Sequence, residues 1–310
     1  MVELGGAHSW EDIGAREEHA LLADWFRSHA RDLPWRGPDR TPWGVLVSEV
    51  MLQQTPVSRV VPAWWDWMAR WPQPADLARE APGEAVRQWD RLGYPRRALN
   101  LHACAVALVE RHAGAVPEAE AELRALPGVG EYTAAAVRAF AFGRRSVVLD
   151  TNVRRVLARF GAGQELPAPS LTAAERARAE VWVPAGDAEA ARWSVAIMEL
   201  GALVCTAGSP RCTACPLAGS CSWLRAGRPA YDGPPRRVQR FAGTDRQVRG
   251  RIMAVLRQAR GPVDRAAVEG AWSEPIQRER ALDSLVADGL VELVGQDRFG
   301  LPSGSPGAGA

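Results

Sequence analysis

Four cysteines are crowded into a short stretch of the chain and could together hold a metal centre. Cys205, Cys212, Cys215 and Cys221 span 17 residues, with six, two and five residues between successive cysteines. Glycines and prolines between them allow the chain to bend tightly enough for the four thiolates to meet. Four thiolates suit a tetrahedral zinc ion or an iron–sulfur cluster. The spacing differs from the paired C-x-x-C arrangement of common zinc ribbons, which favours the cluster.

Two carboxylates stand in apolar surroundings where they could do acid–base or charge-stabilising chemistry. Glu49 is the only acid in the apolar segment Trp43–Leu52. Burial in such a helix favours the neutral carboxyl group, which could then donate a proton near neutrality. The alternative is a structural acid held in a salt bridge. Asp150 follows three apolar residues and precedes a helical segment, so it could cap that helix or carry chemistry.

A glycine-containing turn precedes Asp150 by about 20 residues. In Leu126–Gly130, two glycines let the backbone turn sharply, and the helix that follows directs free N–H groups toward whatever lies there. A DNA phosphate suits such a site, because main-chain N–H groups bind phosphate without reading sequence. Alone, the same turn could be an ordinary helix connection.

The composition limits both chemistry and location. All 38 basic residues are arginine, so no lysine amine is present for Schiff-base catalysis. The net charge of +2 is too small to indicate a nucleic-acid partner by itself. No signal peptide, long apolar segment or disulfide framework is evident. We therefore expect a cytoplasmic protein without membrane contact, acting at the nucleoid.

Apolar residues three and four apart, interrupted by short proline or glycine turns, predict an all-α domain over residues 19–225, preceded by a tail at 1–18. The tryptophans at helical spacing are interpreted as core. They include Trp64, Trp65, Trp67, Trp71 and Trp89. Helices are expected at Glu18–His29, Pro42–Gln54, Pro56–Arg70, Gly83–Leu92, Pro95–His112, Ala119–Leu126 and Glu131–Phe142.

Beyond residue 225 the pattern changes. Residues 226–244 are rich in glycine and proline and predict a linker, and residues 303–310 predict a disordered tail. Residues 245–302 predict a small winged-helix-like domain. Its expected elements are helices at Arg246–Arg260, Val263–Trp272 and Pro275–Asp288 and a hairpin of Leu290–Val294 with Arg298–Leu301. Eight arginines against one acid between residues 236 and 260 indicate either a phosphate-binding face or a solvated helix.

The hairpin LPGVG, the later LDTN and the cysteine loop together resemble the helix-hairpin-helix DNA glycosylases of the endonuclease III superfamily. Leu33-Pro34-Trp35-Arg36 and the segment SEVMLQQT, which contains Glu49, resemble more closely the MutY-type A/G-specific adenine glycosylases. The resemblance runs from about Trp25 to Trp223. It implies two α-helical subdomains, a 4Fe-4S cluster on the four cysteines, and a monomer acting on double-stranded DNA that contains a mispair.

The resemblance also implies roles for individual residues. Glu49 would protonate adenine at N7, and Asp150 would stabilise the oxocarbenium-like sugar. Tyr132 and Asn152 would hold these carboxylates and the attacking water. The flipped base and the opposite base would be bound by Trp35, Arg36, Leu52, Gln53, Gln54, Thr55 and Tyr94, and a phosphate by Gly128, Val129 and Gly130.

Within the superfamily, an imine-forming lysine follows the hairpin in the enzymes that also cut the strand. Tyr132 takes this position here, so the resemblance and the absence of lysine both indicate a monofunctional enzyme. The resemblance implies that it removes adenine opposite 8-oxoguanine or guanine.

The chain also departs from the family pattern. Tyr94 is followed by Pro95 instead of a second tyrosine, and Val195 stands where the family often has a polar residue near adenine. The usual C-terminal recognition domain is absent, as in an actinobacterial-like form. Two alternatives remain open: a thymine or uracil mismatch glycosylase on the same fold, and a non-enzymatic iron–sulfur DNA-binding redox sensor. In the sensor, Arg278 and Arg280 would read bases.

Overall fold

The chain folds into two compact units, each assembled from two separate stretches of sequence. The computed structural model describes residues 10–234 and 241–304. The first unit combines Met1–Arg36 with Ala134–Arg236, and the second combines Gly37–Thr133 with Arg237–Ala310. Within residues 10–234 every regular element is a helix, as the sequence predicts. Across the described residues, no helix has the length and apolar character needed to cross a lipid bilayer.

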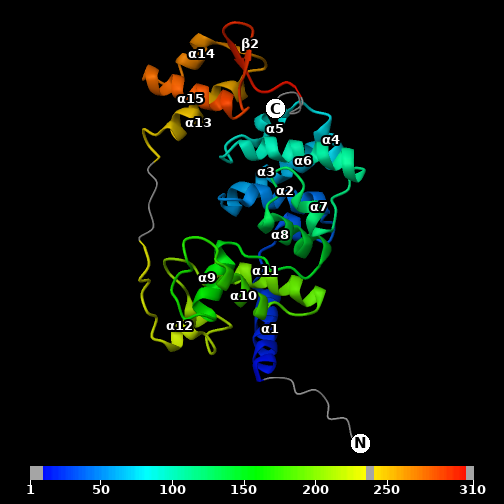
Figure 1. The fold of residues 1–310 in the computed structure, drawn as a ribbon, viewed down its shortest axis with the longest axis vertical. Coiled ribbons are helices and arrows are strands. Elements are labelled where there is room, and N and C mark those ends of the chain that lie inside the picture. The colour runs from blue at the N-terminus through cyan, green and yellow to red at the C-terminus, as the bar shows by residue number, and fades with distance from the viewer. Residues whose placement is uncertain (1–9, 235–240, 305–310) are drawn as a thin grey trace, which may run out of the picture. The chain divides into compact units, whose positions relative to one another are not determined.

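The first unit is a helical bundle built around α11 (Figure 1). α11 packs against α1 and α9, and its apolar face meets that of α9 in one core with Trp193, Ile197 and Leu200. The helices of this unit are α1 (Trp10–His29), η1 (Pro34–Arg36), α9 (Thr151–Phe160), α10 (Ala173–Trp182), α11 (Asp187–Leu203), η2 (Cys212–Ala214) and α12 (Ser222–Arg225), together with most of α8 (Glu131–Phe142). α1 begins at Trp10, inside the segment expected to be a tail.

The second unit is built around α2 (Pro42–Leu52), whose residues from Trp43 to Met51 are all buried. The Thr41 hydroxyl accepts the Gly44 N–H at 3.0 Å and caps the helix, and Pro42 occupies its first turn. A helix that is apolar on all sides must lie inside a helical layer. That layer consists of α3 (Val57–Arg70), α4 (Pro74–Ala78), α5 (Pro82–Trp89), α6 (Arg96–His112) and α7 (Glu120–Arg124).

Most of the tryptophans belong to this core. Trp67 meets Trp71 and Trp89 edge to face, with ring centroids 4.6 and 5.7 Å apart, an arrangement that aromatic quadrupoles favour. Trp64 is also buried. Trp65 is not a core residue, because 56% of it is exposed. The 3.6-residue repeat turns the side chain next to Trp64 away from the core.

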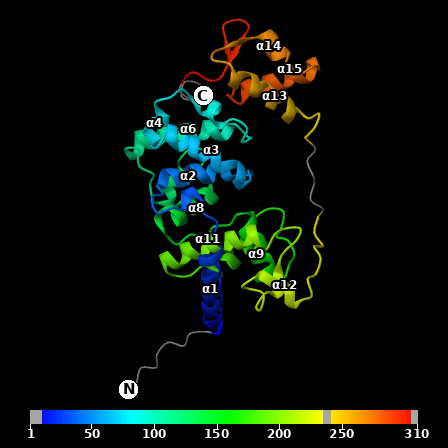
Figure 2. The same ribbon diagram turned by 180° about the vertical axis from the view of Figure 1, so that it is seen from behind.

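Residues 245–304 form a small module of three helices and a three-stranded antiparallel sheet (Figure 2). Phe299 is its buried centre, opposite Val263 on one side and Leu293 on the other. In chain order the elements are α13 (Asp245–Gln258), β1 (Val263–Asp264), α14 (Arg265–Glu269), α15 (Pro275–Ala287), β2 (Glu292–Val294) and β3 (Arg298–Gly300). This is a winged-helix arrangement, except that a strand and a short helix replace the helix expected over Val263–Trp272.

The predicted N-terminal tail, linker and C-terminal tail fall partly outside the described residues, which exclude 1–9, 235–240 and 305–310. The described remainder of the linker contains no helix or strand.

Candidate functional site

Glu49 lies in the last turns of the buried helix α2 and is only 4% exposed. The Tyr132 hydroxyl, from the first turn of α8, donates a hydrogen bond to Glu49 Oε2 at 2.8 Å. Both residues belong to the second unit. The tyrosine orients one carboxylate oxygen of a side chain that the surrounding helices remove from water.

Asp150 caps α9 and carries a second, independent interaction. Its Oδ1 accepts the Val153 N–H at 2.7 Å, and its Oδ2 accepts the Asn152 side-chain amide at 2.8 Å. Burial raises the pKa of Asp150, and these hydrogen bonds only partly oppose that effect. The capping interpretation is thus correct for one oxygen. The other is oriented by the side chain predicted to hold it.

A chain of hydrogen bonds connects Asn152 with the cysteine loop. Arg155 Nη2 donates to Asn152 Oδ1 at 2.8 Å and to the Gly201 carbonyl at 2.7 Å. Its Nε donates to the Cys205 carbonyl at 2.7 Å. Arg155 is buried, so these bonds are shielded from water and hold α9, α11 and the loop in one arrangement.

α9 and α11 approach each other very closely at Gly201. A Cβ atom at residue 201 would lie 2.7 Å from the Asn152 Cβ and 2.9 Å from the Asn152 carbonyl oxygen. Only glycine therefore allows Asn152 to reach its position beside Asp150.

Cys205 follows the end of α11, Cys212 begins η2, Cys215 directly follows η2, and Cys221 caps α12; none forms a disulfide. All four pack against the core of the first unit. Burial, together with the neighbouring Cys205, Cys221 and Cys212, raises the pKa of the Cys215 thiol to about 12. The four cysteines therefore gather at one core.

A buried cation lies beside these sulfurs. Arg159 is 1% exposed, and its Nη1 donates to Cys205 Sγ at 3.4 Å and to the Thr206 carbonyl at 2.8 Å. Within the described residues, no three His, Cys, Asp or Glu side chains form the compact group that holds a single metal ion. The four thiols, with an N–H donor beside Cys205 and apolar residues around them, fit an iron–sulfur cluster. The ligands of such a cluster bind several metal atoms instead of one ion.

A further buried carboxylate, which sequence reasoning missed, lies on α11. Glu199 accepts three hydrogen bonds from Arg31 at 2.7 to 2.9 Å and one from Arg36 Nη2 at 3.1 Å. Burial alone would raise its pKa, but the two arginines lower the pKa to about 2. It lies one helical turn after Val195. A lone acid in the apolar run Ile197–Leu200 was the available signal, the same signal that singled out Glu49.

Arg36, in η1, contacts this carboxylate, and Trp35 precedes Arg36 in the chain. Trp35 is buried, and Arg36 Nη1 is buried without a hydrogen-bond partner among the described residues. An unsatisfied guanidinium N–H is costly in the protein alone. It indicates a site where a ligand acceptor completes the bonding.

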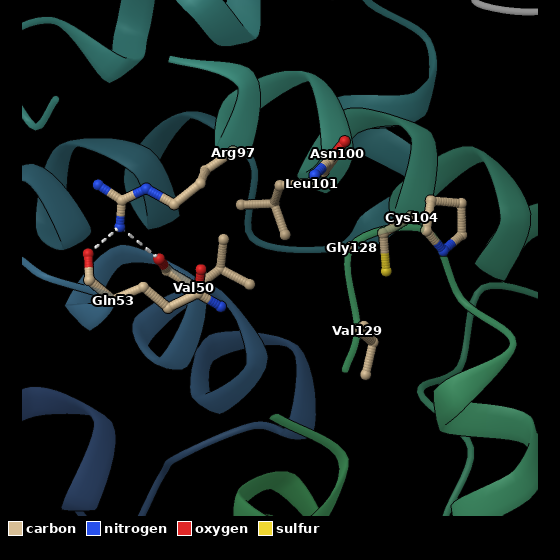
Figure 3. Close-up of a pocket in the computed structure, with 9 residues that line it drawn as sticks. Val50, Gln53, Arg97, Asn100, Leu101, Cys104, Gly128 and Val129 are labelled. Atoms are coloured by element: carbon tan, nitrogen blue, oxygen red, sulfur yellow. Dashed lines mark hydrogen bonds between the residues drawn. The ribbon is translucent and has the colours of Figure 1, made fainter. Parts of the chain in front are cut away.

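The predicted hairpin packs closely against α6. Gly128 has a φ of +75°, and a Cβ atom there would lie 2.7 Å from the Asn100 Cβ, so glycine is required on both counts. Gly130 has open space around its Cα. Figure 3 shows the recess between the two elements, with Asn100, Leu101 and Cys104 on one wall and Gly128 and Val129 on the other.

Two loops bearing Gln54 and Tyr94 are held together by Arg97. Its Nη1 donates to the carbonyls of Val50 at 2.9 Å and Gln53 at 2.6 Å (Figure 3). Its Nη2 donates to the Thr55 hydroxyl at 3.1 Å and to the Gly93 carbonyl at 2.9 Å. Burial lowers the pKa of Arg97 to about 10, and among the described residues no carboxylate pairs with it. No pattern in the sequence indicated that Arg97 makes these hydrogen bonds.

The brace leaves Gln54 and Tyr94 exposed, each with a left-handed backbone, at φ +56° and +49°. Left-handed residues other than glycine cost free energy and often mark functional positions. Thr55 is buried, with its hydroxyl bonded inside the brace, and the Gln53 amide donates to the Thr133 hydroxyl at 3.4 Å.

The structure therefore pairs Glu49 with Tyr132, and Gln54 with Tyr94, in the second unit. It pairs Asp150 with Asn152, and Trp35 with Arg36, in the first.

Comparison with protein families finds two matches along the chain. Residues 47–183 match the HhH-GPD superfamily of base excision DNA repair proteins. Residues 205–221 match the iron-sulfur binding domain of endonuclease III. The second match covers the four cysteines and identifies their loop as an iron–sulfur site.

Two mycobacterial proteins match almost the whole chain. The adenine DNA glycosylase of Mycobacterium tuberculosis is 52% identical over 285 residues, which is 91% of this chain and 92% of that protein. The adenine DNA glycosylase of Mycolicibacterium smegmatis is 50% identical over 281 residues, 90% of this chain and 94% of that protein.

Solved structures share the helical fold. A thermostable thymine-DNA glycosylase superimposes with a TM-score of 0.61 at 26% identity, covering 69% of this chain and 100% of that one. Endonuclease III in a non-covalent DNA complex superimposes with a TM-score of 0.59 at 24% identity, covering 72% and 100%.

Proposed function

The chain belongs to the adenine DNA glycosylase family, and from this premise we propose that it hydrolyses the N-glycosidic bond of adenine mispaired with 8-oxoguanine or guanine, without cutting the strand. The observation that carries the proposal is the pair of carboxyl groups, the buried Glu49 and the partly buried Asp150, each oriented by a hydrogen bond from its own partner. A reaction that expels a base from a sugar needs a proton on the base and a negative charge near the sugar.

Asp150 provides the charge. As the glycosidic bond lengthens, the sugar becomes cationic, and a carboxylate with little access to water stabilises that cation more strongly than an exposed one would. Asn152 holds Oδ2 through its amide, and the Val153 N–H holds Oδ1, so the carboxylate reorganises little during the reaction. Water then attacks the sugar, and its proton passes to a carboxylate.

Glu49 provides the proton. Protonation of adenine at N7 makes the base a neutral leaving group, and the Tyr132 hydroxyl orients the carboxyl group toward that task. The base must leave the duplex to be reached. Trp35 in the first unit and Leu52 in the second are the proposed apolar contacts of the base. Arg36 Nη1, which has no hydrogen-bond partner among the described residues, is the proposed N–H donor for a ring nitrogen.

The absence of strand cleavage follows from the side chains available. Cleavage through an imine needs a primary amine, and none of the 310 residues is lysine. Tyr132, at the position where bifunctional relatives have that amine, instead hydrogen-bonds Glu49. The product is therefore an intact strand with an abasic site.

Recognition of the opposite base falls to the exposed Gln54 and Tyr94, which the Arg97 brace presents on left-handed backbones. The hairpin residues Gly128–Gly130 bind a phosphate of the same duplex through the open side at Gly130.

We propose that the iron–sulfur cluster is of the 4Fe-4S type, held by Cys205, Cys212, Cys215 and Cys221. When bound, it cross-links the loop through four thiolates. Arg159 stabilises that loop by donating to the Cys205 sulfur and to the Thr206 carbonyl. Anaerobically purified protein should contain about four iron and four sulfide per chain. Colourless protein with one zinc per chain would contradict the assignment.

The activity is tested with duplexes carrying adenine opposite 8-oxoguanine, adenine opposite guanine, or thymine opposite guanine, each treated with alkali to cut abasic sites. We expect breaks in the adenine strand of the first two duplexes only after alkali. Breaks in the thymine strand alone would establish a thymine glycosylase, and breaks without alkali would contradict the monofunctional assignment.

Replacing Gly201 with alanine should impair catalysis from outside the site. The added methyl group collides with Asn152, so α9 must shift and Asp150 with it. We expect a loss of about 2 kcal/mol in the free energy of unfolding and at least about tenfold slower adenine release under single-turnover conditions. Duplex binding should be retained.

Gly250→Ala is the matched control, because Gly250 is also a helical glycine but has open space around it. We expect it to be neutral or stabilising. Wild-type adenine release by Gly201→Ala would show that the contact with Asn152 does not position Asp150.

A further inference from the structure

The C-terminal module of residues 245–304 is anchored to α5 of the same unit. The Gly83 N–H, in the first turn of α5, donates to the Pro302 carbonyl at 2.7 Å, and a Cβ atom at residue 83 would lie 2.7 Å from that same oxygen. Arg87, on the same helix, donates to the Ala259 carbonyl at 2.6 Å and to the Arg257 carbonyl. A cation thus satisfies the last carbonyls of α13.

A second contact joins the module to the first residue of α6, close to Tyr94 in the chain. Arg96, two residues after Tyr94, forms an ion pair with Asp288 at 3.2 Å. Asp288 also pairs with Arg249 of α13 at 2.5 Å. The carboxylate therefore joins α6 and α13 near the start of both helices.

The first turn of α13 itself contacts Tyr94. The guanidinium carbon of Arg246 lies 4.4 Å from the centroid of the Tyr94 ring, and that of Arg97 lies 5.7 Å from it. Tyr94 is 44% exposed. A guanidinium this close to a ring restricts the directions that the ring can take.

The rest of the module is poorly suited to reading bases. Arg278 is buried and donates to the Trp272 carbonyl at 2.9 Å, and Arg280 binds Asp245 through two hydrogen bonds. The most exposed large apolar residue of α15 is Ile276, at 77%. The two arginines expected to read bases in a sequence-reading protein thus bind other residues of the module, whereas Arg246 contacts Tyr94.

We propose that Arg246 is a positioning residue for Tyr94, and that through it the C-terminal module binds the duplex beside the mispair. The inference rests on the proposed function, in which Tyr94 probes the base stack. In the free protein the guanidinium holds the ring ready for insertion. When the ring enters the stack, a base takes the place of the guanidinium on that face, and the released cation lies beside the DNA backbone and binds a phosphate.

The test uses full-length protein and a duplex with adenine opposite 8-oxoguanine and 2-aminopurine next to the 8-oxoguanine. Insertion of a side chain unstacks the neighbouring base and increases 2-aminopurine fluorescence. Arg246→Gln and Tyr94→Ala should each remove more than half of the increase seen with the wild-type protein. It should also bind about fivefold more weakly and lower the salt dependence of binding by about one unit of slope.

Arg251→Gln is the matched control. It removes an equal charge from an exposed position on the same helix, roughly 140° around the helix from Arg246. It should keep the fluorescence increase of the wild-type protein. Arg246→Lys should restore part of the increase, because an ammonium group also binds a ring face. Tyr94→Ala with Arg246→Gln should lose no more fluorescence than Tyr94→Ala alone.

The inference is overturned if Arg246→Gln and Arg251→Gln behave alike, if the Tyr94 and Arg246 effects add, or if Tyr94→Ala leaves the fluorescence unchanged. Adenine release by the wild-type protein, measured on the same duplex, separates this result from the proposed function. If the wild-type protein releases adenine but Arg246→Gln keeps the wild-type fluorescence increase, the inference is overturned and the proposed function stands. Absence of release overturns the proposed function, whatever the fluorescence of the variants.

Discussion

Replacing Asp150 with asparagine is expected to slow adenine release by about a thousandfold. Asparagine has nearly the same shape, but it has no negative charge to stabilise the cationic sugar. It is also among the best residues for capping a helix, so the Val153 N–H keeps an acceptor and α9 keeps its start. Single-turnover adenine release and duplex binding would be measured together, and only the release rate should fall.

The stability of this variant provides an independent check with a defined sign. Burial raises the pKa of Asp150 above its value in the unfolded chain. A carboxyl group whose pKa is higher in the folded protein ionises less readily there than in the unfolded chain. The free energy of unfolding therefore falls as the pH rises from the pKa of the unfolded chain to that of the folded protein. Asp150→Asn does not ionise, so at neutral pH it should unfold at the same temperature as the wild type or a higher one.

The same shift predicts how activity responds to acid. Asp150 must be ionised to stabilise the sugar, and its raised pKa moves the acidic loss of activity to a higher pH than an ordinary aspartate would give. Rates with saturating enzyme would be measured across the acidic range. An Asp150→Asn variant with wild-type rates would contradict the assigned role of Asp150, and one that fails to fold would contradict the stability prediction.

The sequence predicted best where chemistry itself restricts the residue type. A chain without lysine excludes imine chemistry by a lysine side chain, whereas the four bunched cysteines left zinc and an iron–sulfur cluster both open until the family comparison. The lone acid in an apolar helix indicated a buried carboxyl group, and Glu49 is buried. The helical repeat likewise predicted the α-helical architecture. It placed Trp67, Trp71 and Trp89 in the core correctly, because an apolar face of a helix needs a partner surface.

The residues that sequence reasoning missed depend on contacts between distant segments. Glu199 acquires its two arginines from residues more than 160 positions earlier in the chain. Arg97 becomes a brace only because the turns at Gln53 and Gly93 come together around it. Arginines are usually exposed, so nothing in a local pattern marks a buried one. The prediction that Trp65 is a core residue was wrong because Trp65 directly follows the core residue Trp64 in the chain and was assigned to the core with it.

Replacing Glu49 with glutamine should slow adenine release by about a hundredfold or more. Glutamine keeps the shape and can accept the Tyr132 hydrogen bond, but it has no acidic proton to give to N7. Tyr132→Phe is the matched comparison. It removes one 2.8 Å hydrogen bond and leaves the acid in place, so the expected loss is only about tenfold.

The substrate offers a sharper discrimination than the variant alone. A duplex with 7-deazaadenine has a carbon in place of N7 and accepts no proton there. If Glu49 acts on N7, the wild-type protein should release 7-deazaadenine about as slowly as the Glu49→Gln variant releases adenine. On the 7-deazaadenine duplex, Glu49→Gln should then slow release little further. A large additional loss would mean that Glu49 acts elsewhere, on the sugar or on the attacking water. The two carboxylates would then share one role, and the leaving base would need another source for its proton.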